Sequence, residues 1–269
     1  MADLVSEAPL ALVAIVLFVV LSAARELGTF VHRRLSRHAD DPDGDSSDEG
    51  FILSAALGLL ALLLAFTFGL ALSRYEARRE LVVAESNAIG TAYMRAQVLD
   101  APERARLSGL LAAYARTRLA FGLAEQQDKP RYLASSRAQR VDLEIATLEI
   151  VRPIRATALG PSLLAATNEV VDLGAAREAA LETRLPTTVV EALLAFTVIT
   201  ALIIGYVLAG TKSRHRVATS VLFVLLTMAI WIILDLDRPR RGTIVVSQDP
   251  MAQLVKSMPG GPSPANPHP

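Results

Sequence analysis

The ionisable residues best placed to do chemistry in this chain lie where apolar runs meet polar sequence. Glu191 lies one turn inside an apolar run, and Asp235 and Asp237 end another, with Arg238 directly after them. Charge in lipid is costly, so such residues form either an ion or proton path or a set of interfacial anchors that pair with one another. Their positions near the ends of the runs favour anchoring.

Metal and nucleophilic sites are not indicated. None of the histidines (His32, His38, His215 and His268) has a second ligand at metal spacing on a predicted helix face. Cysteine is absent, which removes thiolate and disulfide chemistry. The chain has neither a nucleophile-elbow motif nor a phosphate-binding glycine loop. We therefore expect no enzyme activity and no cofactor.

The acidic segment 40–49 invites comparison with a calcium loop. Counted from Asp41, the glycine position of an EF-hand falls on Ser46 and the closing glutamate on Ile52. The spacing fails, so the segment is interpreted as a solvated acidic linker, with a weak surface calcium contact as the alternative.

Composition points to a membrane. The chain has 269 residues, 52% of them hydrophobic, and its mean hydropathy is +0.39, more apolar than is usual for a soluble domain. The 27 basic and 27 acidic residues cancel, so no basic field exists to hold a phosphate backbone, and nucleic acid is not an expected partner.

The apolar excess is concentrated in four runs, each read as a membrane-spanning helix. They are Pro9–Ala24, Phe51–Leu72, Val189–Gly210 and Val217–Leu234. No basic residue precedes the first run, which favours a span over the alternative of a cleaved signal peptide. The last two runs are joined by a short basic loop and form a helical hairpin.

The second run passes into charged sequence without a break. Residues 65–80, AFTFGLALSRYEARRE, contain no proline and no glycine pair. They predict one continuous helix that leaves the membrane near Arg74 and becomes part of a soluble helical domain.

The soluble domain shows apolar residues at helical spacing and no alternating strand pattern. The stripes comprise Tyr75, Val82, Ser86, Ile89, Tyr93 and Ala96; Leu107, Leu110, Leu111, Tyr114 and Phe121; and Val141, Ile145 and Leu148. Asp100 and Glu103 predict a capped helix start. After the fourth span, residues 242–247 predict a short strand and Asp249 a short helix.

The expected fold is an all-α membrane protein, with four transmembrane helices and a helical soluble domain inserted between the second and third. Its parts are 1–50 (first span and acidic loop), 51–72 (second span), 73–188 (soluble domain), 189–234 (hairpin), 235–258 (tail with strand and helix) and 259–269 (disordered).

Charge does not settle the orientation in the membrane. The short loops carry Arg25, Arg33, Arg34, Arg37, Lys212, Arg214 and Arg216, which argues that their side is cytoplasmic. A similar number of arginines lies on the other side, among them Arg74, Arg78, Arg79 and Arg238.

Residues 65–75, AFTFGLALSRY, resemble the second-helix segment of bestrophin anion channels. The whole chain is more closely similar to a family of bacterial membrane proteins described as bestrophin-like. That similarity is carried by residues 85–91 (ESNAIGT), by 168–186 with Asp172 and Arg177, and by 235–239 (DLDRP) with Gly242.

The resemblance implies a pentamer in the cell membrane, a pore lined by the second helix, anions as the conducted ion, and a cytosolic helical domain with both termini. The implied pore-lining candidates are Gly58, Leu62, Phe66 and Leu70. Leu62 and Phe66 are suited to hydrophobic rings, whereas Gly58 is not. The calcium clasp of bestrophins is not reproduced by Asp235 and Asp237 alone. The alternative to a channel is a non-conducting membrane protein whose helical domain binds a partner or senses a ligand.

Overall fold

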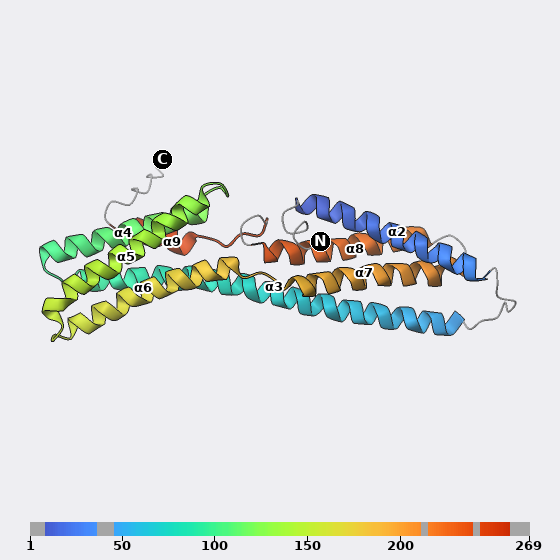
Figure 1. Ribbon diagram of the computed structural model, residues 1–269, viewed down its shortest axis with the longest axis horizontal. Helices are drawn as coiled ribbons and strands as arrows, with labels where there is room; N and C mark the ends of the chain where they lie inside the picture. Colours follow the sequence, from blue (N-terminus) through green and yellow to red (C-terminus); the bar gives the residue numbers. More distant parts are fainter. Residues whose placement is uncertain (1–8, 37–45, 211–214, 239–242, 259–269) are drawn as a thin grey trace, which may run out of the picture. The chain divides into compact units, whose positions relative to one another are not determined.

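The computed structural model describes residues 9–36, 46–210, 215–238 and 243–258, and these are almost entirely helical (Figure 1). The elements are α2 (Leu10–Ser36), α3 (Ser46–Ala96), α4 (Ala101–Leu123), α5 (Lys129–Ile154), α6 (Leu159–Glu182), α7 (Thr187–Val207), the 3₁₀ turn η1 (Leu208–Gly210), α8 (His215–Asp237) and α9 (Asp249–Ser257). The described residues contain no strand, so the predicted all-α class is confirmed. Most of the acidic segment before Ser46 and the tail after Met258 lie outside them.

Helix α3 runs through residues 65–80 without interruption. This confirms the continuous helix predicted from the lack of a proline or a glycine pair there, because nothing in that stretch removes a backbone donor or favours a turn. The apolar and the charged parts of the sequence therefore belong to one element.

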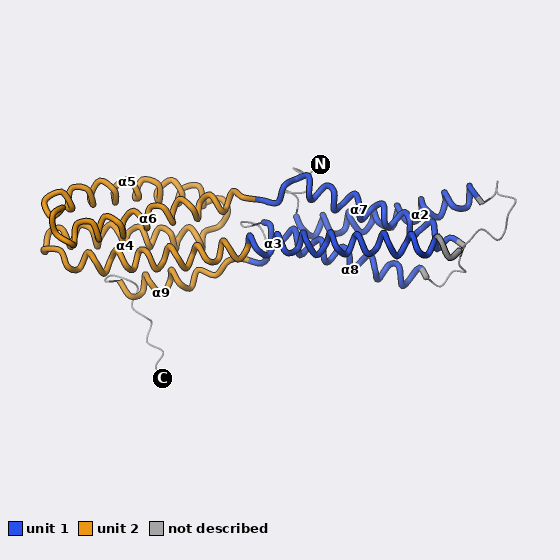
Figure 2. The backbone as a smooth tube through the Cα atoms, turned by 90° about the horizontal axis from the view of Figure 1, so that it is seen from below, with its two compact units in different colours: residues 1–74, 184–244 blue, residues 75–183, 245–269 orange. Residues whose placement is uncertain are grey.

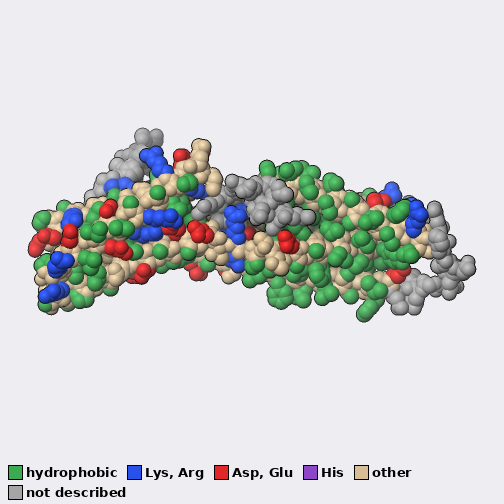
Figure 3. Space-filling view, viewed as in Figure 1, with side chains coloured by type: hydrophobic (Ala, Val, Ile, Leu, Met, Phe, Trp, Pro, Cys, Tyr) green, Lys and Arg blue, Asp and Glu red, His purple; other side chains and the backbone are tan. Residues whose placement is uncertain are grey.

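The chain forms two compact units (Figure 2). The first comprises residues 1–74 and 184–244, and the second residues 75–183 and 245–269. The first unit contains α2, the apolar part of α3, α7 and α8. Four of the described helices are long and apolar enough to cross a membrane. Apolar side chains predominate on the visible surface of the part that contains α2, α7 and α8 (Figure 3). The chain is a membrane protein.

The first membrane helix is longer than its apolar run. Arg25, Arg33 and Arg34, expected in a loop, lie within α2, which continues to Ser36. The reason is local, because no proline follows the apolar run and a single glycine does not end a helix. The expectation that these arginines lie in a loop is therefore wrong, because they belong to the helix.

Helices α2 and α7 are packed closely through two glycines. A Cβ atom at Gly205 would collide with the backbone carbonyl of Arg25, and one at Gly28 with the carbonyl of Leu202. Thr29 Oγ1 also donates a hydrogen bond to the carbonyl oxygen of Gly205, at 3.1 Å. Small residues that let backbones approach are typical of helix contacts in membranes.

We expect Gly205→Ala to lower the free energy of unfolding by about 1–3 kcal/mol, because the added methyl group meets backbone atoms that cannot rotate away. Thermal unfolding in detergent, followed by circular dichroism, measures the change. Gly69→Ala is the matched control, since no atom lies within 4 Å of its built Cβ. Equal unfolding temperatures for the two variants would contradict the packing argument.

The second unit contains the charged part of α3 together with α4, α5, α6 and α9. Its core includes Ile89, Leu107, Leu111, Leu163 and Met251. The predicted stripes on α3 and α4 face this core. Helix α4 begins after Asp100 as predicted, but the Asp100 side chain makes no capping hydrogen bond.

The helix indicated by Val141, Ile145 and Leu148 is α5. Val141, Ile145 and Leu148 are exposed, and the helix buries Leu143 and Ile150 instead. Both faces of α5 carry apolar residues at helical spacing, so periodicity alone does not distinguish the core face from the outer one.

A short strand was predicted over residues 242–247. Residues 243–247, the part that the structure describes, form neither a strand nor a helix, so the prediction is wrong there. The amide groups of Thr243 and Ile244 donate hydrogen bonds to the carboxylate of Asp235, at 2.7 and 2.9 Å. A strand needs a neighbouring strand for these donors, and here a carboxylate satisfies them instead. The helix expected from Asp249 is α9.

Candidate functional site

The pore-lining candidates lie on one face of α3 and are exposed. Leu62, Phe66 and Leu70 are exposed by 53, 64 and 47%, and a Cβ atom added at Gly58 would meet nothing within 4 Å. The spacing of four residues keeps them in one row along the helix. None of the other described helices covers this row, which leaves it open to lipid or to further copies of the chain.

The opposite face of the same segment packs inside the first unit. Leu60, Thr67 and Ala71 are buried there. The hydroxyl of Thr67 donates to the carbonyl oxygen of Leu63, so this polar side chain is satisfied without a partner from another helix. The rotational position of α3 is therefore fixed by packing within the unit.

The arginine and glutamate expected at membrane boundaries differ in their surroundings. Arg74 donates from Nη1 to the carbonyl oxygen of Arg184, at the end of the α6–α7 connection. Glu191 is exposed in the second turn of α7. The structure does not bring these two side chains together with the carboxylates that end α8.

The two carboxylates that end α8 are buried and bind backbone groups. Asp235 accepts hydrogen bonds from the amide and the hydroxyl of Thr243, both at 2.7 Å. Asp237 accepts one from the amide of Leu185, at 2.8 Å. The amide of Arg238 donates to the carbonyl oxygen of Asp235. The Asp235 carboxylate binds Thr243 and Ile244 and so holds this part of the tail against the end of α8.

A buried charge cluster lies in the second unit, where Glu85 of α3 meets Tyr114 and Arg118 of α4 and Arg177 of α6. We call these four residues the Glu85 cluster. The Oε1 atom of Glu85 accepts from Tyr114 Oη at 2.8 Å and Arg118 Nε at 2.6 Å. Its Oε2 atom accepts from Arg118 Nη2 at 3.2 Å and Arg177 Nη1 at 2.6 Å. Both carboxylate oxygens therefore have two donors each.

Burial and charge in the Glu85 cluster determine which groups carry protons. Burial raises the pKa of Tyr114, and the adjacent Glu85 carboxylate raises it further, so the phenol stays protonated and donates a hydrogen bond to Glu85. Burial alone would raise the pKa of Glu85, but Arg118 and Arg177 together lower it below its ordinary value. Glu85 is thus a carboxylate held between two guanidinium groups.

Two glycines leave the space that side chains in and next to the Glu85 cluster occupy. A Cβ atom at Gly174 would collide with the Tyr114 hydroxyl, and one at Gly122 with the side chain of Gln248. Gln248 Oε1 accepts from Arg177 Nη2 at 2.6 Å, which links the cluster to the residue before α9.

The sequence marked Glu85 and Arg177 only as parts of a resemblance. It gave no signal that they pair, because they lie 92 residues apart. The segment that contains Arg177 also contains Leu185, which binds Asp237 in the first unit. The segment 168–186 therefore contacts each of the other two segments that carry the resemblance, at Glu85 in the second unit and at Asp237 in the first.

Acid is expected to remove part of the stability that the Glu85 cluster provides. The pKa of Glu85 is lower in the folded protein than the ordinary value of 4.5. A carboxylate whose pKa is lower in the folded state than in the unfolded state adds to the free energy of unfolding at any pH above its unfolded-state pKa. This contribution is lost as the pH falls through the folded-state pKa. The unfolding temperature of the wild type should therefore fall below about pH 4.5 more steeply than that of Glu85→Gln. Parallel pH profiles would contradict this.

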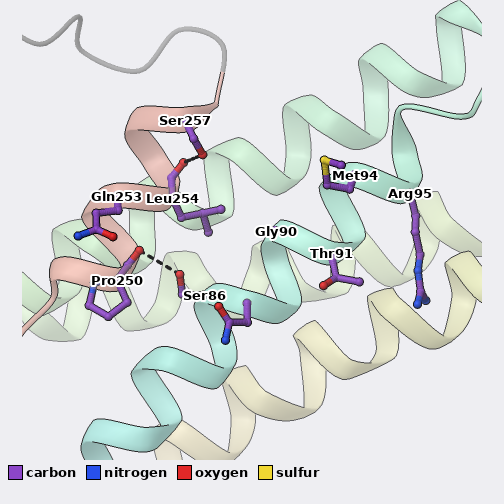
Figure 4. A pocket seen from close by; sticks show the side chains of 10 residues that line it. Ser86, Gly90, Thr91, Met94, Arg95, Pro250, Gln253, Leu254 and Ser257 are labelled. Carbon is purple, nitrogen blue, oxygen red and sulfur yellow. Dashed lines mark hydrogen bonds between the residues drawn. The ribbon is translucent and has the colours of Figure 1, made fainter.

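A groove of about 730 Å³ lies between α3 and α9 in the second unit (Figure 4). It is lined by Ser86, Asn87, Gly90, Thr91, Met94, Arg95, Pro250, Gln253, Leu254 and Ser257. The hydroxyl of Ser86 donates to the carbonyl oxygen of Pro250 at 3.0 Å, across the groove. Arg95 is turned away from α9 and donates to the carbonyl oxygen of Ser162 at 2.6 Å. The groove is largely open to solvent and is lined by both polar and apolar side chains.

Among the described residues, no group of three or more histidine and acidic side chains is arranged to hold a metal ion. In comparisons with known proteins, the family model of the bestrophin-like domain matches residues 15–251. No curated protein and no solved structure matches the chain.

Proposed function

Since the chain belongs to the bestrophin-like family, we propose that it is one subunit of an oligomeric ion channel whose pore is lined by α3. The observation that carries the proposal is the exposed row of Gly58, Leu62, Phe66 and Leu70. A channel subunit needs a helix face that its own chain leaves uncovered, and α3 has one.

The chemistry of this row suits a hydrophobic constriction. Leu62 and Phe66 from several copies would form two successive apolar rings, which oppose ion passage by excluding water when the opening is narrow. Gly58 contributes no side chain and leaves the neighbouring level wide. The narrowest part of the path is therefore expected at Phe66.

Packing within the first unit supports the same proposal. Leu60, Thr67 and Ala71 are buried on the opposite face of α3, which keeps the exposed row facing outward. A lining helix must keep its rotation, because a turn of 100° would present a different set of side chains to the path.

The resemblance to bestrophins extends the proposal to a pentamer, to anions as the conducted ion and to the inner or plasma membrane. Native mass spectrometry of the purified protein measures the number of copies. Ion flux into liposomes that contain the protein then measures conduction, with protein-free liposomes as the control. Intact oligomers that carry no ions above that control would overturn the channel.

The groove between α3 and α9 favours a second candidate function, a non-conducting membrane protein that senses a ligand or binds a partner. The exposed stripe of Val141, Ile145 and Leu148 on α5 is a further uncovered surface. A monomeric mass in detergent, together with absent ion flux, would favour this function over the channel.

A further inference from the structure

The second unit carries an apolar row on α5 that the other described helices leave uncovered. Val141, Ile145 and Leu148 are exposed by 52, 50 and 55%. They follow one another by four and three residues, so they form a row about 10 Å long on one side of the helix. Ala134 and Ala138, also exposed, extend this side of α5 with small side chains that permit close approach. The spacing is that of a helix that lies in a groove of a partner.

The same unit contains a groove of similar length. The groove between α3 and α9 is bordered on α3 by residues 86–95, a segment about 13 Å long (Figure 4). Gly90 contributes no side chain to it, and Met94 at its edge is exposed by 70%. Val98, one turn beyond Met94, is exposed by 69%. An open groove between two helices, with apolar side chains along its edge, has the shape to accept a third helix.

Helix α5 does not reach the groove of its own copy. Figure 2 shows α5 and α9 on opposite edges of the second unit, with α4 and α6 between them. None of the residues that line the groove belongs to α5. The row and the groove therefore meet only when they come from two copies, and each copy then uses a different surface toward each neighbour. Such head-to-tail contacts close into a ring when the rotation between neighbours allows it.

Acidic residues flank the row on α5. Asp142 and Glu144, which lie beside it, are both exposed. The basic residues one turn earlier, Arg137 and Arg140, bind the carboxylate of Glu178. The surroundings of the row are therefore negatively charged.

The groove carries charge of the opposite sign. Among its ten lining residues, Arg95 is the charged one. Lys256 of α9 is exposed directly beside Ser257, which lines the groove. Opposite charges around an apolar contact favour the encounter of two surfaces and fix their orientation.

We propose that the α5 row of one copy docks into the α3–α9 groove of a second copy. The proposal rests on the oligomer of the channel function and identifies the surfaces through which the second units of neighbouring copies join. The two uncovered surfaces of this unit then have one common partner, which is the chain itself.

Cross-linking between two differently tagged copies tests the contact. The chain contains no cysteine, so introduced thiols are the only ones present. One full-length copy carries Ile145→Cys and the other Thr91→Cys, and the two are co-expressed and treated in membranes with a short bismaleimide. A product with both tags and twice the 28.8 kDa mass of the chain is expected. Leu123→Cys in place of Ile145→Cys is the matched control, because Leu123 is exposed by 71% at the end of α4, and it should give no such product.

Filling the groove should prevent the cross-link. A Cβ atom at Gly90 meets only the Leu254 side chain, at 3.4 Å, so α3 accepts a side chain there that extends into the groove. Gly90→Phe, added to the Thr91→Cys copy, should abolish the product. Gly109→Phe is the control, since no atom lies within 4 Å of its built Cβ, and it should leave the product unchanged. Circular dichroism confirms that each variant is folded, and if Gly90→Phe does not fold, the mixed cross-link decides alone.

Native mass spectrometry of the same samples separates the docking from the channel. Intact oligomers without the mixed product overturn the docking and leave the channel standing. So does a product that Ile145→Cys forms by itself, which would place α5 against α5, or a product that persists in folded Gly90→Phe. A monomeric mass overturns the docking and the channel together. The mixed product in oligomers that carry no ions supports the docking and overturns the channel.

Discussion

Glu85→Gln is expected to destabilise the protein by about 3–5 kcal/mol, because it leaves two buried guanidinium groups without their carboxylate. Glu85 and Arg118 are fully buried, and Arg177 is nearly so. The isosteric amide keeps the shape of the side chain, so the loss reports charge and hydrogen bonding rather than a cavity. The unfolding temperature in detergent should fall by roughly 10 °C.

Glu144→Gln is the control, since it neutralises an exposed glutamate and should change stability by less than about 0.5 kcal/mol. A double-mutant cycle of Glu85→Gln with Arg177→Met measures the coupling. Removing the second charge as well should recover part of the loss. If Glu85→Gln unfolds at the wild-type temperature, the Glu85 cluster does not stabilise the second unit.

The second large effect is expected at the apolar row. Phe66→Ala should increase ion flux through assembled channels about tenfold, because it removes the largest side chain at the proposed constriction and lets water enter. A tenfold change corresponds to about 1.4 kcal/mol in the barrier. Flux into liposomes at equal protein content measures it.

Phe196→Ala provides the comparison, since Phe196 is an exposed phenylalanine of α7. It removes the same atoms from a different helix and should leave the flux unchanged. Equal flux in both variants and the wild type would place the constriction elsewhere than Phe66.

The membrane helices could be predicted from the sequence, because the signals for them are local. Continuity of α3 follows from the absence of helix breakers in residues 65–80. The row that contains Leu62 and Phe66 was implied by the resemblance to bestrophins. The end of α2 was misplaced because hydropathy reports where a helix leaves lipid and carries no information on where it stops.

The interactions of the charged residues could not be predicted, because their partners are distant in sequence. Glu85 lies 33 residues from Arg118 and 92 from Arg177. Asp235 and Asp237 were interpreted as boundary charges, and the structure shows that they bind backbone amides of the tail and of the α6–α7 connection. Helix α5 has apolar residues on two faces, and the packing of the other helices decides that Leu143 is buried and Val141 is exposed.

The docking of α9 has a practical consequence for anyone who shortens or labels this protein. Met251, Val255 and Met258 belong to the core of the second unit, and Gln248 accepts from a buried arginine. A truncation before residue 248 would therefore expose that core and remove a hydrogen-bond acceptor of Arg177. A loss of function in such a variant would reflect damage to the second unit rather than a direct role of the tail. Purification handles belong beyond Met258.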